Sequence, residues 1–558
     1  MKKNRLIFSG FVLFCLVGLV IWRLVEVQIL QHESWSSQAR SIQERQVEIN
    51  PVRGTIFDRQ GRELALNTRA YSLAVDPFDM SKPERMVEIL HRQLGKGKEE
   101  LRDLIYRPSY FVWIDRQVDY WKGEAIKSQA RQENVDGLIL LDSWERAYPR
   151  EELGAAILGF TGIDGEGLSG VEFSLDGILA GEPTVKQIIY GANRIPYREK
   201  TLKEGQPGYD LYLTIDSRVQ HVTEKALRSG VKRFEAKDGW AVVMDPENGE
   251  LLALAQKGSF DPNNYGEYRP ERWKNEAIAH TFEPGSILKV FTALAALKYG
   301  AAGPETKVNG NSPVLVSGHP VQNAQYRDYG VITLSEAIKH SVNTAIVRIA
   351  RRLGKERLYQ FLTEAGFGRK TGVRLPGEEG GRLRPVRQWS DLAIGAIPIG
   401  QAISVNAVQL ASRVAAVANG GSVVKPKIVK EIVNPEEEGE GTGERRGGSH
   451  RLVSASTAAQ VEEMMCQVVE DGTGQAAQLP GYQVCGKTGT AQKAAPGGGY
   501  SRDKYISSFV GYFPRENPRY LILVVLDEVG TWPVWGGATA GNVFKDIATR
   551  ILALRETS

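Results

Sequence analysis

The sequence contains little cysteine, and this shortage excludes two kinds of stabilising site. Its 558 residues include only three cysteines, Cys15, Cys466 and Cys485. Cys15 falls in an apolar N-terminal run. The other two have neither the number expected of a disulfide framework nor the spacing of a metal site. We therefore expect Cys466 and Cys485 to remain unpaired, and we expect no metal site.

Excess charge and low-complexity sequence are also scarce. The formal net charge is only +4, and neither a zinc-ligand cluster nor an aromatic-basic RNA motif is present, so no nucleic-acid partner is indicated. The single low-complexity stretch, at 434–450, predicts a solvated loop. With 42% hydrophobic and 24% charged residues, the chain has the composition of a folded protein. Its length predicts about two or three domains.

The N-terminus contains an uncharged apolar run from Leu6 to Trp22, preceded by Lys2, Lys3 and Arg5. The run lies near the lower end of the roughly 17–25 residues that cross a bilayer. The basic residues before it predict a cytoplasmic N-terminus, with the rest of the chain outside. A cleaved signal peptide is the alternative, but bulky residues follow the run where a cleavage site needs small ones. An uncleaved single-pass anchor is the favoured interpretation.

Regular strand and helix patterns begin near Leu211. A strand leads into an amphipathic helix at Asp216, a good N-cap residue, and two strands then flank a turn at 246–249. Apolar helical stretches fill the middle of this part. Three strands and a closing helix are predicted at 482–492, 505–514, 520–529 and 542–554. Strands at both ends with helices between them predict an α+β domain, one antiparallel sheet flanked by helices.

A serine followed three residues later by a lysine occurs four times, so this spacing alone identifies no site. The matches that begin at Ser229, Ser422 and Ser501 fall at a helix end, in a turn and in a polar loop. Only Ser286 opens a long apolar helix, and Lys289 follows on the same face. Burial there lowers the pKa of a lysine towards that of a general base. The alternative is a plain helix cap with a lysine that reaches solvent.

A second pair of polar residues, Ser341 and Asn343, follows this helix. The segment reads as a helix, or as a turn between helices. The Ser341 hydroxyl is suited to carry a proton to a leaving amine, a step that acyl transfer from a peptide requires. The same SVN triplet recurs at 404–406.

A third element is the strand segment KTGT, in which the glycine allows close backbone approach. It consists of Lys487, Thr488, Gly489 and Thr490. The KTG triplet recurs at 370–372, in a loop-like context rich in glycine and proline. Every element therefore has a second match, but only one ordered set has a suitable local structure throughout.

This ordered set resembles the S-x-x-K, S-x-N and K-T-G motifs of penicillin-binding proteins and class A β-lactamases. Two earlier segments, RGTIFDRQGRELA at 53–65 and GFTGIDGEGLSGVE at 159–172, resemble the pedestal signatures of class B penicillin-binding proteins. The resemblance covers nearly the whole chain. It implies an anchor at 1–28, an elongated α/β pedestal or dimerisation domain at 29–208, and a β-lactamase-like serine-transpeptidase domain at 209–558.

The resemblance also implies a role for each site residue and no cofactor. Ser286 would attack the penultimate D-Ala carbonyl of a stem peptide, with Lys289 as base, Ser341 as proton relay and Asn343 holding substrate and lysine. Lys487 and Thr488 would bind the substrate carboxylate on the strand that contains Gly489, and the N–H groups of Ser286 and Thr490 would form the oxyanion hole. β-Lactams would acylate the same serine, and a SEDS-type glycan polymerase would be the membrane partner.

Several alternatives remain at this level. Asn343 and the modest length favour a role in septal wall synthesis, whereas elongation or spore wall synthesis would use the same chemistry. A secreted β-lactamase would need a carboxylate for deacylation, and the motifs assign none to that role; the anchor and the large pedestal also argue against it. A β-lactam sensor would need more membrane spans. A catalytically silent scaffold would not need Ser286, Lys289 and Lys487 intact.

Overall fold

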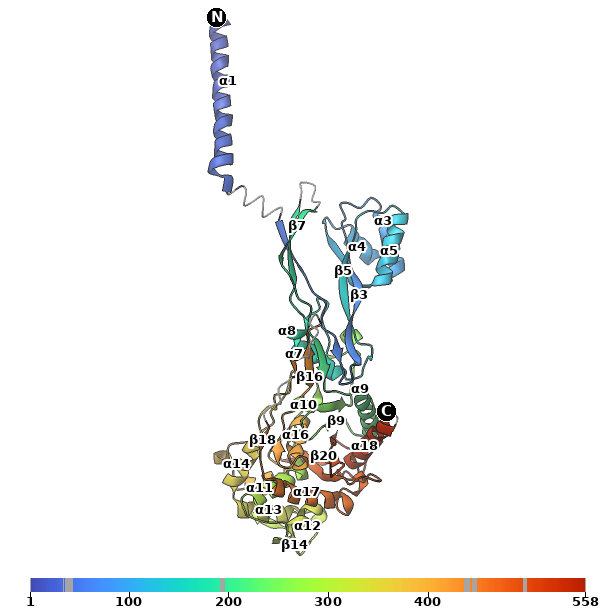
Figure 1. Cartoon of the computed structure of the whole chain (residues 1–558), viewed down its shortest axis with the longest axis vertical. Helices are drawn as coiled ribbons and strands as arrows, with labels where there is room; N and C mark the ends of the chain where they lie inside the picture. The colour runs from blue at the N-terminus through green and yellow to red at the C-terminus, as the bar shows by residue number, and fades with distance from the viewer. Residues whose placement is uncertain are drawn as a thin grey trace. The chain divides into compact units, whose positions relative to one another are not determined.

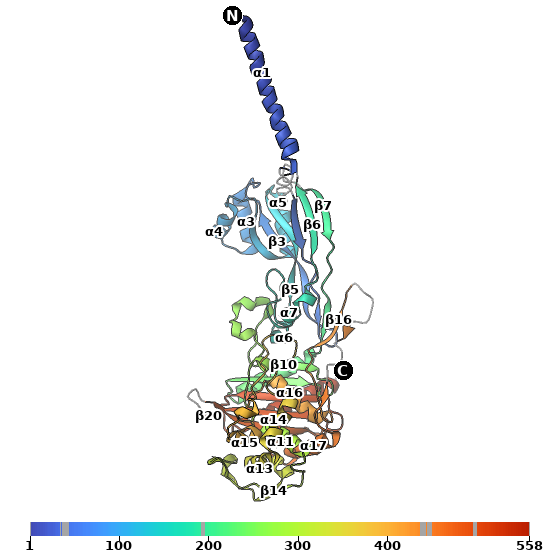
Figure 2. The ribbon, with the colours of Figure 1, turned by 90° about the vertical axis from the view of Figure 1, so that its left-hand side faces the viewer.

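The computed structural model describes residues 2–33, 35, 44–190, 196–435, 442–443, 449–494 and 499–556. These residues form two compact units, one of residues 1–53 with 180–208 and one of 54–179 with 209–558. Figures 1 and 2 show the chain from two directions. Most of the loop expected at 434–450 lies outside the described residues.

The first unit contains the apolar N-terminal helix. Helix α1 (Lys2–Val25) continues into a short π-helical turn, η1 (Glu26–Leu30). Residues Lys3–Leu30 are long and apolar enough to cross a membrane, and none of the most apolar stretch is buried against the rest of the protein. This helix matches the expected single-pass anchor. The unit also holds an antiparallel sheet in the order β1-β6-β7, with strands at Glu44–Ile49, Thr184–Tyr190 and Pro196–Lys203.

In the second unit, residues 54–179 form a sheet with helices packed on it. The strands are β2 (Ile56–Phe57), β3 (Glu63–Val75), β4 (Val112–Asp119) and β5 (Leu138–Ala147). The helices are α3 (Pro83–Leu94), α4 (Lys98–Ile105) and α5 (Tyr120–Gln132), followed by the short α6 (Ala155–Leu158), α7 (Gly170–Ser174) and α8 (Asp176–Leu179). The first three helices and the sheet share one apolar core.

The turn after β2 is held by the buried carboxylate of Asp58. This side chain accepts hydrogen bonds from the N–H groups of Gln60 and Arg62 and from the hydroxyl and N–H of Ser217, where helix α9 (Ser217–Arg233) begins. Burial raises the pKa of Asp58, but these bonds outweigh burial and hold it below its usual value. The RGTIFDRQGRELA segment therefore fastens β2 to the start of the C-terminal part.

The C-terminal part is built on a five-stranded antiparallel sheet in the order β10-β9-β21-β20-β19. The strands are β9 (Asp238–Met244), β10 (Leu251–Gln256), β19 (Cys485–Ala494), β20 (Tyr500–Phe513) and β21 (Tyr520–Asp527). Alternate residues of β9 and β21 enter separate apolar cores on the two faces. A smaller set of strands, β8 (Asp210–Leu213), β16 (Val429–Val433) and β17 (Thr442–Gly443), joins the sheet of β2 and β3.

Helices cover both faces of the five-stranded sheet, as the pattern predicted. Helices α9 (Ser217–Arg233) and α18 (Ala540–Glu556) lie side by side on one face (Figure 1). The other face carries α10 (Glu276–Ala279), α11 (Leu288–Lys298), α16 (Ala407–Ala418) and α17 (Ala455–Glu470). The remaining helices are α12 (Leu334–Lys339), α13 (Asn343–Leu353), α14 (Lys355–Glu364) and α15 (Ala393–Ala396). Short strand pairs are β11 with β14 (Lys307–Asn309, Val331–Thr333), β12 with β13 (Val314–Val316, His319–Val321) and β15 with β18 (Ser422–Val423, His450–Arg451).

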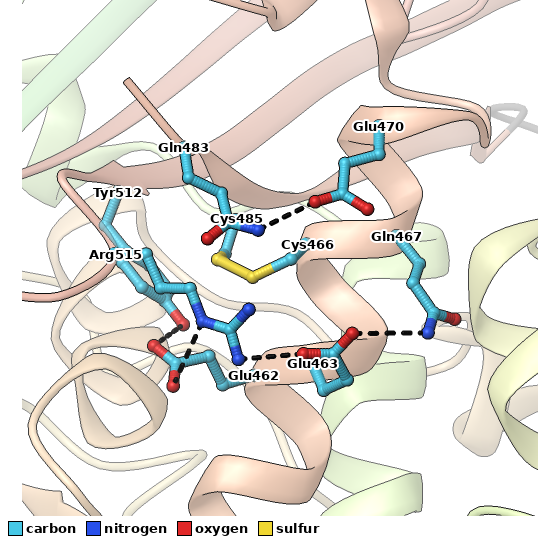
Figure 3. Close-up of a disulfide and its surroundings, with 9 residues drawn as sticks. All are labelled: Glu462, Glu463, Cys466, Gln467, Glu470, Gln483, Cys485, Tyr512 and Arg515. Atoms are coloured by element: carbon cyan, nitrogen blue, oxygen red, sulfur yellow. Dashed lines mark hydrogen bonds and ion pairs between the residues drawn. A yellow bond between two sulfur atoms is a disulfide. The ribbon is translucent and has the colours of Figure 1, made fainter. Parts of the chain in front are cut away.

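The expectation of unpaired cysteines is wrong. Cys466 on α17 and Cys485 at the start of β19 form a disulfide, with their Cα atoms 3.8 Å apart (Figure 3). The chain leaves α17 and turns back as β19, and this return brings together residues 19 apart in the sequence. Spacing alone gave no sign of the pairing, because tertiary packing of the helix on the strand creates it. Cys15 is a free cysteine.

Candidate active site

Ser286 lies in a short 3₁₀ turn, η4 (Gly285–Ile287), which leads directly into α11. Gly285 has a φ of 53°, and a Cβ there would lie 2.8 Å from the carbonyl oxygen of Thr490 on β19. Glycine is therefore needed for the turn to approach the strand so closely. Ser286 is half-buried. Its position at the start of a buried helix agrees with the sequence pattern.

Lys289 is completely buried, so the alternative of a lysine that reaches solvent is excluded. Its Nζ donates to the Ser341 carbonyl at 2.6 Å and to Asn343 Oδ1 at 2.6 Å, and it lies 3.1 Å from Ser341 Oγ. Among the described residues, no carboxylate forms an ion pair with Lys289. Burial, followed by the positive charge of Lys487, lowers its pKa well below the usual value. A neutral amine is the form that can accept a proton.

Ser341 occupies the turn between α12 and α13, and its backbone is left-handed, with a φ of 58°. This conformation costs a non-glycine residue about 1–3 kcal/mol, and functional sites often contain such residues. The turn directs both the carbonyl and the hydroxyl of Ser341 at Lys289. Asn343 is the first residue of α13, and its Nδ2 donates to the Gln322 carbonyl at 2.8 Å.

Lys487 on β19 is also completely buried. Its Nζ lies 3.0 Å from Ser341 Oγ, 3.2 Å from the Thr488 carbonyl and 3.3 Å from Thr488 Oγ1. Burial lowers its pKa to about 7. The hydroxyl of Ser341 therefore lies between two buried amines, which brings the three sequence motifs into one hydrogen-bond network.

The rest of the KTGT segment belongs to β19, which is an edge strand of the five-stranded sheet. Gly489 has no room for a side chain, because a Cβ would lie 2.2 Å from Ser508 Oγ. Thr490 Oγ1 accepts the N–H of Gly536 at 3.1 Å, so its own proton is free to be donated. Thr488 Oγ1 lies 2.9 Å from Thr473 Oγ1.

Two of these neighbours, Thr473 and Gly536, were missed from the sequence. Each lies in a glycine-containing segment, DGTG at 471–474 and WGG at 535–537. A Cβ on Gly536 would lie 2.2 Å from the Gly489 carbonyl, so this loop passes very close to β19. Glycines in a loop signal close approach in general but do not identify the strand approached.

Glu283, three residues before Ser286, was also missed. Its Oε1 accepts the Ala402 N–H at 2.9 Å and the Tyr500 hydroxyl at 3.3 Å, and burial raises its pKa. It lines a cavity of about 560 Å³ whose wall also includes Arg382, Arg384, Trp389 and Gln492. Because Gln492 continues β19 beyond Thr490, this cavity extends along the same strand.

The chance matches to the motifs have ordinary structural contacts. The hydroxyl of Ser229 donates to a carbonyl in its own helix, and that of Ser501 donates to Asp503. Thr371, in the second KTG, donates through its N–H and hydroxyl to Glu378. Asn406, in the second SVN, caps helix α16. The structure thus links Lys289, Ser341, Asn343 and Lys487 by hydrogen bonds and gives these copies other partners.

Comparison with known proteins identifies the domains. The penicillin-binding protein transpeptidase domain matches residues 239–549, and the penicillin-binding protein dimerisation domain matches residues 48–213. Stage V sporulation protein D of Bacillus subtilis is 31% identical, over 98% of this chain and 85% of that protein. The probable peptidoglycan D,D-transpeptidase PbpC of Pseudomonas aeruginosa is 30% identical, over 98% and 94%.

A solved structure agrees with these relatives. Penicillin-binding protein 3 from Mycobacterium tuberculosis, complexed with aztreonam, has a TM-score of 0.72 and 29% identity, over 92% of this chain and 97% of that chain. The domain matches, the full-length relatives and the connected serine-lysine site point to one family. The chain belongs to the class B penicillin-binding proteins, the peptidoglycan D,D-transpeptidases that combine a dimerisation domain with a serine-transpeptidase domain.

Proposed function

We propose that this protein cross-links peptidoglycan stem peptides through an acyl-enzyme on Ser286. The observation that carries the proposal is the Ser341 hydroxyl, which lies 3.1 Å from Lys289 Nζ and 3.0 Å from Lys487 Nζ. A serine nucleophile needs a neutral base close by and a path for its proton. The two amines and the hydroxyl between them supply both.

In the acylation step, Ser286 Oγ attacks the carbonyl of the penultimate D-Ala while Lys289 accepts the hydroxyl proton. Burial and the charge of Lys487 favour the neutral form of Lys289 that this step requires. The peptide bond then breaks, and Ser341 passes a proton from Lys289 to the leaving nitrogen. The products are a serine ester and free D-Ala.

The developing oxyanion is stabilised by the backbone N–H groups of Ser286 and Thr490. The close approach of Gly285 to the Thr490 carbonyl supports this role, because it brings the turn and the strand together. Preorganised donors of this kind typically contribute about 3–4 kcal/mol to lowering the barrier.

The donor peptide lies along β19, the outer strand of the sheet, where its backbone can pair as an added strand. Lys487, Thr488 and the hydroxyl of Thr490 bind the terminal carboxylate, and Gly489 lets β19 pack closely against Ser508. The cavity next to Glu283 gives the rest of the stem room to bind. A neighbouring stem's amine then attacks the ester, which forms the cross-link and frees Ser286.

β-Lactams acylate the same serine in this proposal. Related structures of Mycobacterium tuberculosis penicillin-binding protein 3 were solved in complex with aztreonam and with ampicillin, which supports β-lactam binding by this chain. The strained amide takes the place of the D-Ala-D-Ala bond, and no amine acceptor is then positioned to release the enzyme.

The proposed organisation is an anchor at 1–28, a pedestal or dimerisation domain at 29–208 and the transpeptidase domain at 209–558. The basic residues before α1 favour a cytoplasmic N-terminus and an extracytoplasmic catalytic domain. A SEDS-type glycan polymerase is the proposed membrane partner, reached through the anchor and pedestal. Crosslinking from residues of α1 to such a polymerase tests this pairing, and an uncrosslinked anchor contradicts it.

Septal wall synthesis is the proposed setting, supported by Asn343 in the SxN position and by one relative named as an FtsI homologue. Spore wall synthesis is the second candidate, because one full-length relative is named stage V sporulation protein D. Imaging a tagged copy in growing and sporulating cells separates the two. Signal at septa supports division, signal around the forespore supports the second candidate, and signal along the sidewall contradicts both.

Labelling of the full-length protein with a fluorescent penicillin tests the chemistry. The wild type and Ser501→Ala are expected to label, and Ser286→Ala is expected not to. Ser501 heads one of the chance motifs and is half-buried like Ser286, so it is a matched control. Label that persists in Ser286→Ala and is lost in Ser501→Ala would overturn the assignment.

A further inference from the structure

The amide of Asn343 is held at both ends. Its Oδ1 accepts from Lys289 Nζ at 2.6 Å, and its Nδ2 donates to the Gln322 carbonyl at 2.8 Å. An asparagine amide has one accepting end and one donating end. The Gln322 carbonyl can only accept, so it binds the NH₂ end and leaves the oxygen facing Lys289. The orientation of Asn343 therefore depends on where the backbone of Gln322 lies.

The backbone of Gln322 is held in turn by the side chain of the next residue, Asn323. Both the NH₂ group and the oxygen of this buried amide are hydrogen-bonded. Its Nδ2 donates to the carbonyls of Gly310 and Arg327, both at 2.8 Å, and its Oδ1 accepts the N–H of Thr344 at 3.0 Å. The Thr344 hydroxyl lies 3.1 Å from Asn323 Oδ1 and 2.9 Å from the Gly310 carbonyl, so its one proton is shared between them. Asn323 thus ties its own loop to the residue that follows Asn343.

These bonds also supply a missing helix cap. Helix α13 begins at Asn343, and its N-cap residue is Val342, whose side chain has no oxygen with which to accept an N–H of the first turn. Asn323 Oδ1 accepts the N–H of Thr344 in that turn. A residue from the preceding loop therefore caps the helix that presents Asn343 to the active site.

We propose that Asn323 is a positioning residue for acyl transfer: it fixes the loop at Gln322 so that the amide oxygen of Asn343 faces Lys289. The inference rests on the proposed function, in which Lys289 is the base for Ser286. Without Asn323, the carbonyls of Gly310 and Arg327 lose a donor. The Asn343 amide is then free to turn its NH₂ end towards the amine.

The chain offers a matched control in Asn406, the asparagine of the second SVN. It is completely buried, its Oδ1 accepts the Gln409 N–H at 2.7 Å, and its Nδ2 donates to the Glu379 carbonyl at 2.7 Å. It therefore caps α16 from a loop much as Asn323 caps α13. Unlike Asn343, neither Gln409 nor Glu379 is among the described hydrogen-bond partners of Lys289.

The test measures the second-order rate constant for penicillin acylation of the full-length protein in detergent, together with its thermal midpoint. Asn323→Ala is expected to slow acylation about tenfold, whereas Asn406→Ala, at a comparable loss of thermal midpoint, stays within about twofold of wild type. The double variant Asn323→Ala/Asn343→Ala is expected to react within about twofold of Asn343→Ala alone, because both changes remove the same contact.

The pH profile gives a readout that a purely structural role would not change. A carbonyl oxygen stabilises the charged form of the lysine, so its loss lowers the pKa of Lys289. The acid limb of acylation is expected to move to lower pH in Asn323→Ala and Asn343→Ala, and to stay in place in Asn406→Ala. Should Asn323→Ala fold poorly, Thr344→Val removes the hydroxyl that Asn323 Oδ1 and the Gly310 carbonyl share, and it is expected to give a smaller effect in the same direction.

The inference would be overturned if Asn323→Ala were acylated at the wild-type rate, or if its acid limb did not shift. It would also be overturned if the rate losses of Asn323→Ala and Asn343→Ala multiplied in the double variant. Each of these outcomes would leave acylation of Ser286 intact. Failure of the wild-type protein to label at Ser286 would overturn the proposed function, and this inference with it.

Discussion

Lys289 and Lys487, from a helix and a strand almost two hundred residues apart in the sequence, both contact the hydroxyl of Ser341. Both amines are completely buried, and both have lowered pKa values. Two neighbouring buried cations are unfavourable, so the site favours a state in which one of them is neutral.

The first prediction concerns the proton path. Lys289→Met is expected to slow acylation by about 10²–10⁴-fold, because a methionine of similar size cannot accept the proton of Ser286. Ser341→Ala is expected to cause a smaller loss, since it removes the relay but leaves the base. Single-turnover labelling with a fluorescent penicillin measures both rates. Equal rates in Lys289→Met and wild type would contradict the role of the lysine.

The second prediction concerns the pH dependence of acylation by a carboxylate-bearing penicillin. Lys487 has a pKa of about 7, and it binds the anionic ligand best when protonated. The rate is therefore expected to fall on the alkaline side above about pH 7, while protonation of Lys289, whose pKa burial lowers well below the usual value, sets the acid limb. Lys487→Arg keeps its charge and is expected to move the alkaline limb to higher pH. An unchanged alkaline limb in this variant would show that another group controls it.

The third prediction concerns stability. Between about pH 7, where folded Lys487 titrates, and about pH 10.4, where an unfolded lysine does, the unfolded chain holds a proton that the folded protein has released. The free energy of unfolding therefore rises with pH across this window, by up to about 1.4 kcal/mol per pH unit from this residue. Urea unfolding at several pH values measures the slope, which is expected to be smaller in Lys487→Met. Equal pH slopes of the free energy of unfolding in the wild type and in Lys487→Met would contradict this prediction.

The fourth prediction concerns the disulfide. Cys466 and Cys485 close a loop with a sequence separation of 19, and opening a loop of this length costs about 3 kcal/mol in the chain-entropy model. Cys466→Ser/Cys485→Ser is expected to lower the free energy of unfolding by about that amount, with a lower thermal midpoint. Adding a reductant to wild type should reproduce the loss, and the reductant should leave the double variant unchanged. A reductant-insensitive wild type would argue against the bond.

Much of the fold could be predicted from local patterns. The helix that begins after Asp216 and the two strands around the turn at 246–249 were correct, because capping residues and alternating apolar residues act over short distances. The disulfide was predicted wrongly, since it depends on the packing of α17 against β19. Thr473 and Gly536 were missed for the same reason, because each comes near β19 only through a loop whose path the local sequence does not determine.

The sequence by itself determined the apolar N-terminal helix, the ordered serine-lysine motifs and their local contexts, because hydrophobic runs and residue spacing along a helix or strand are properties of neighbouring residues. Only the tertiary structure shows that the side chains of the selected motifs contact one another, whereas Ser501 and Asn406 have other partners. Ser286 and Ser501 share a spacing, and Asn343 and Asn406 share a triplet. Lys289, Ser341 and Lys487 meet because the helices pack against one face of an antiparallel sheet whose last strand runs past them. Burial in that contact, which no short segment encodes, is what lowers the pKa values of the two lysines.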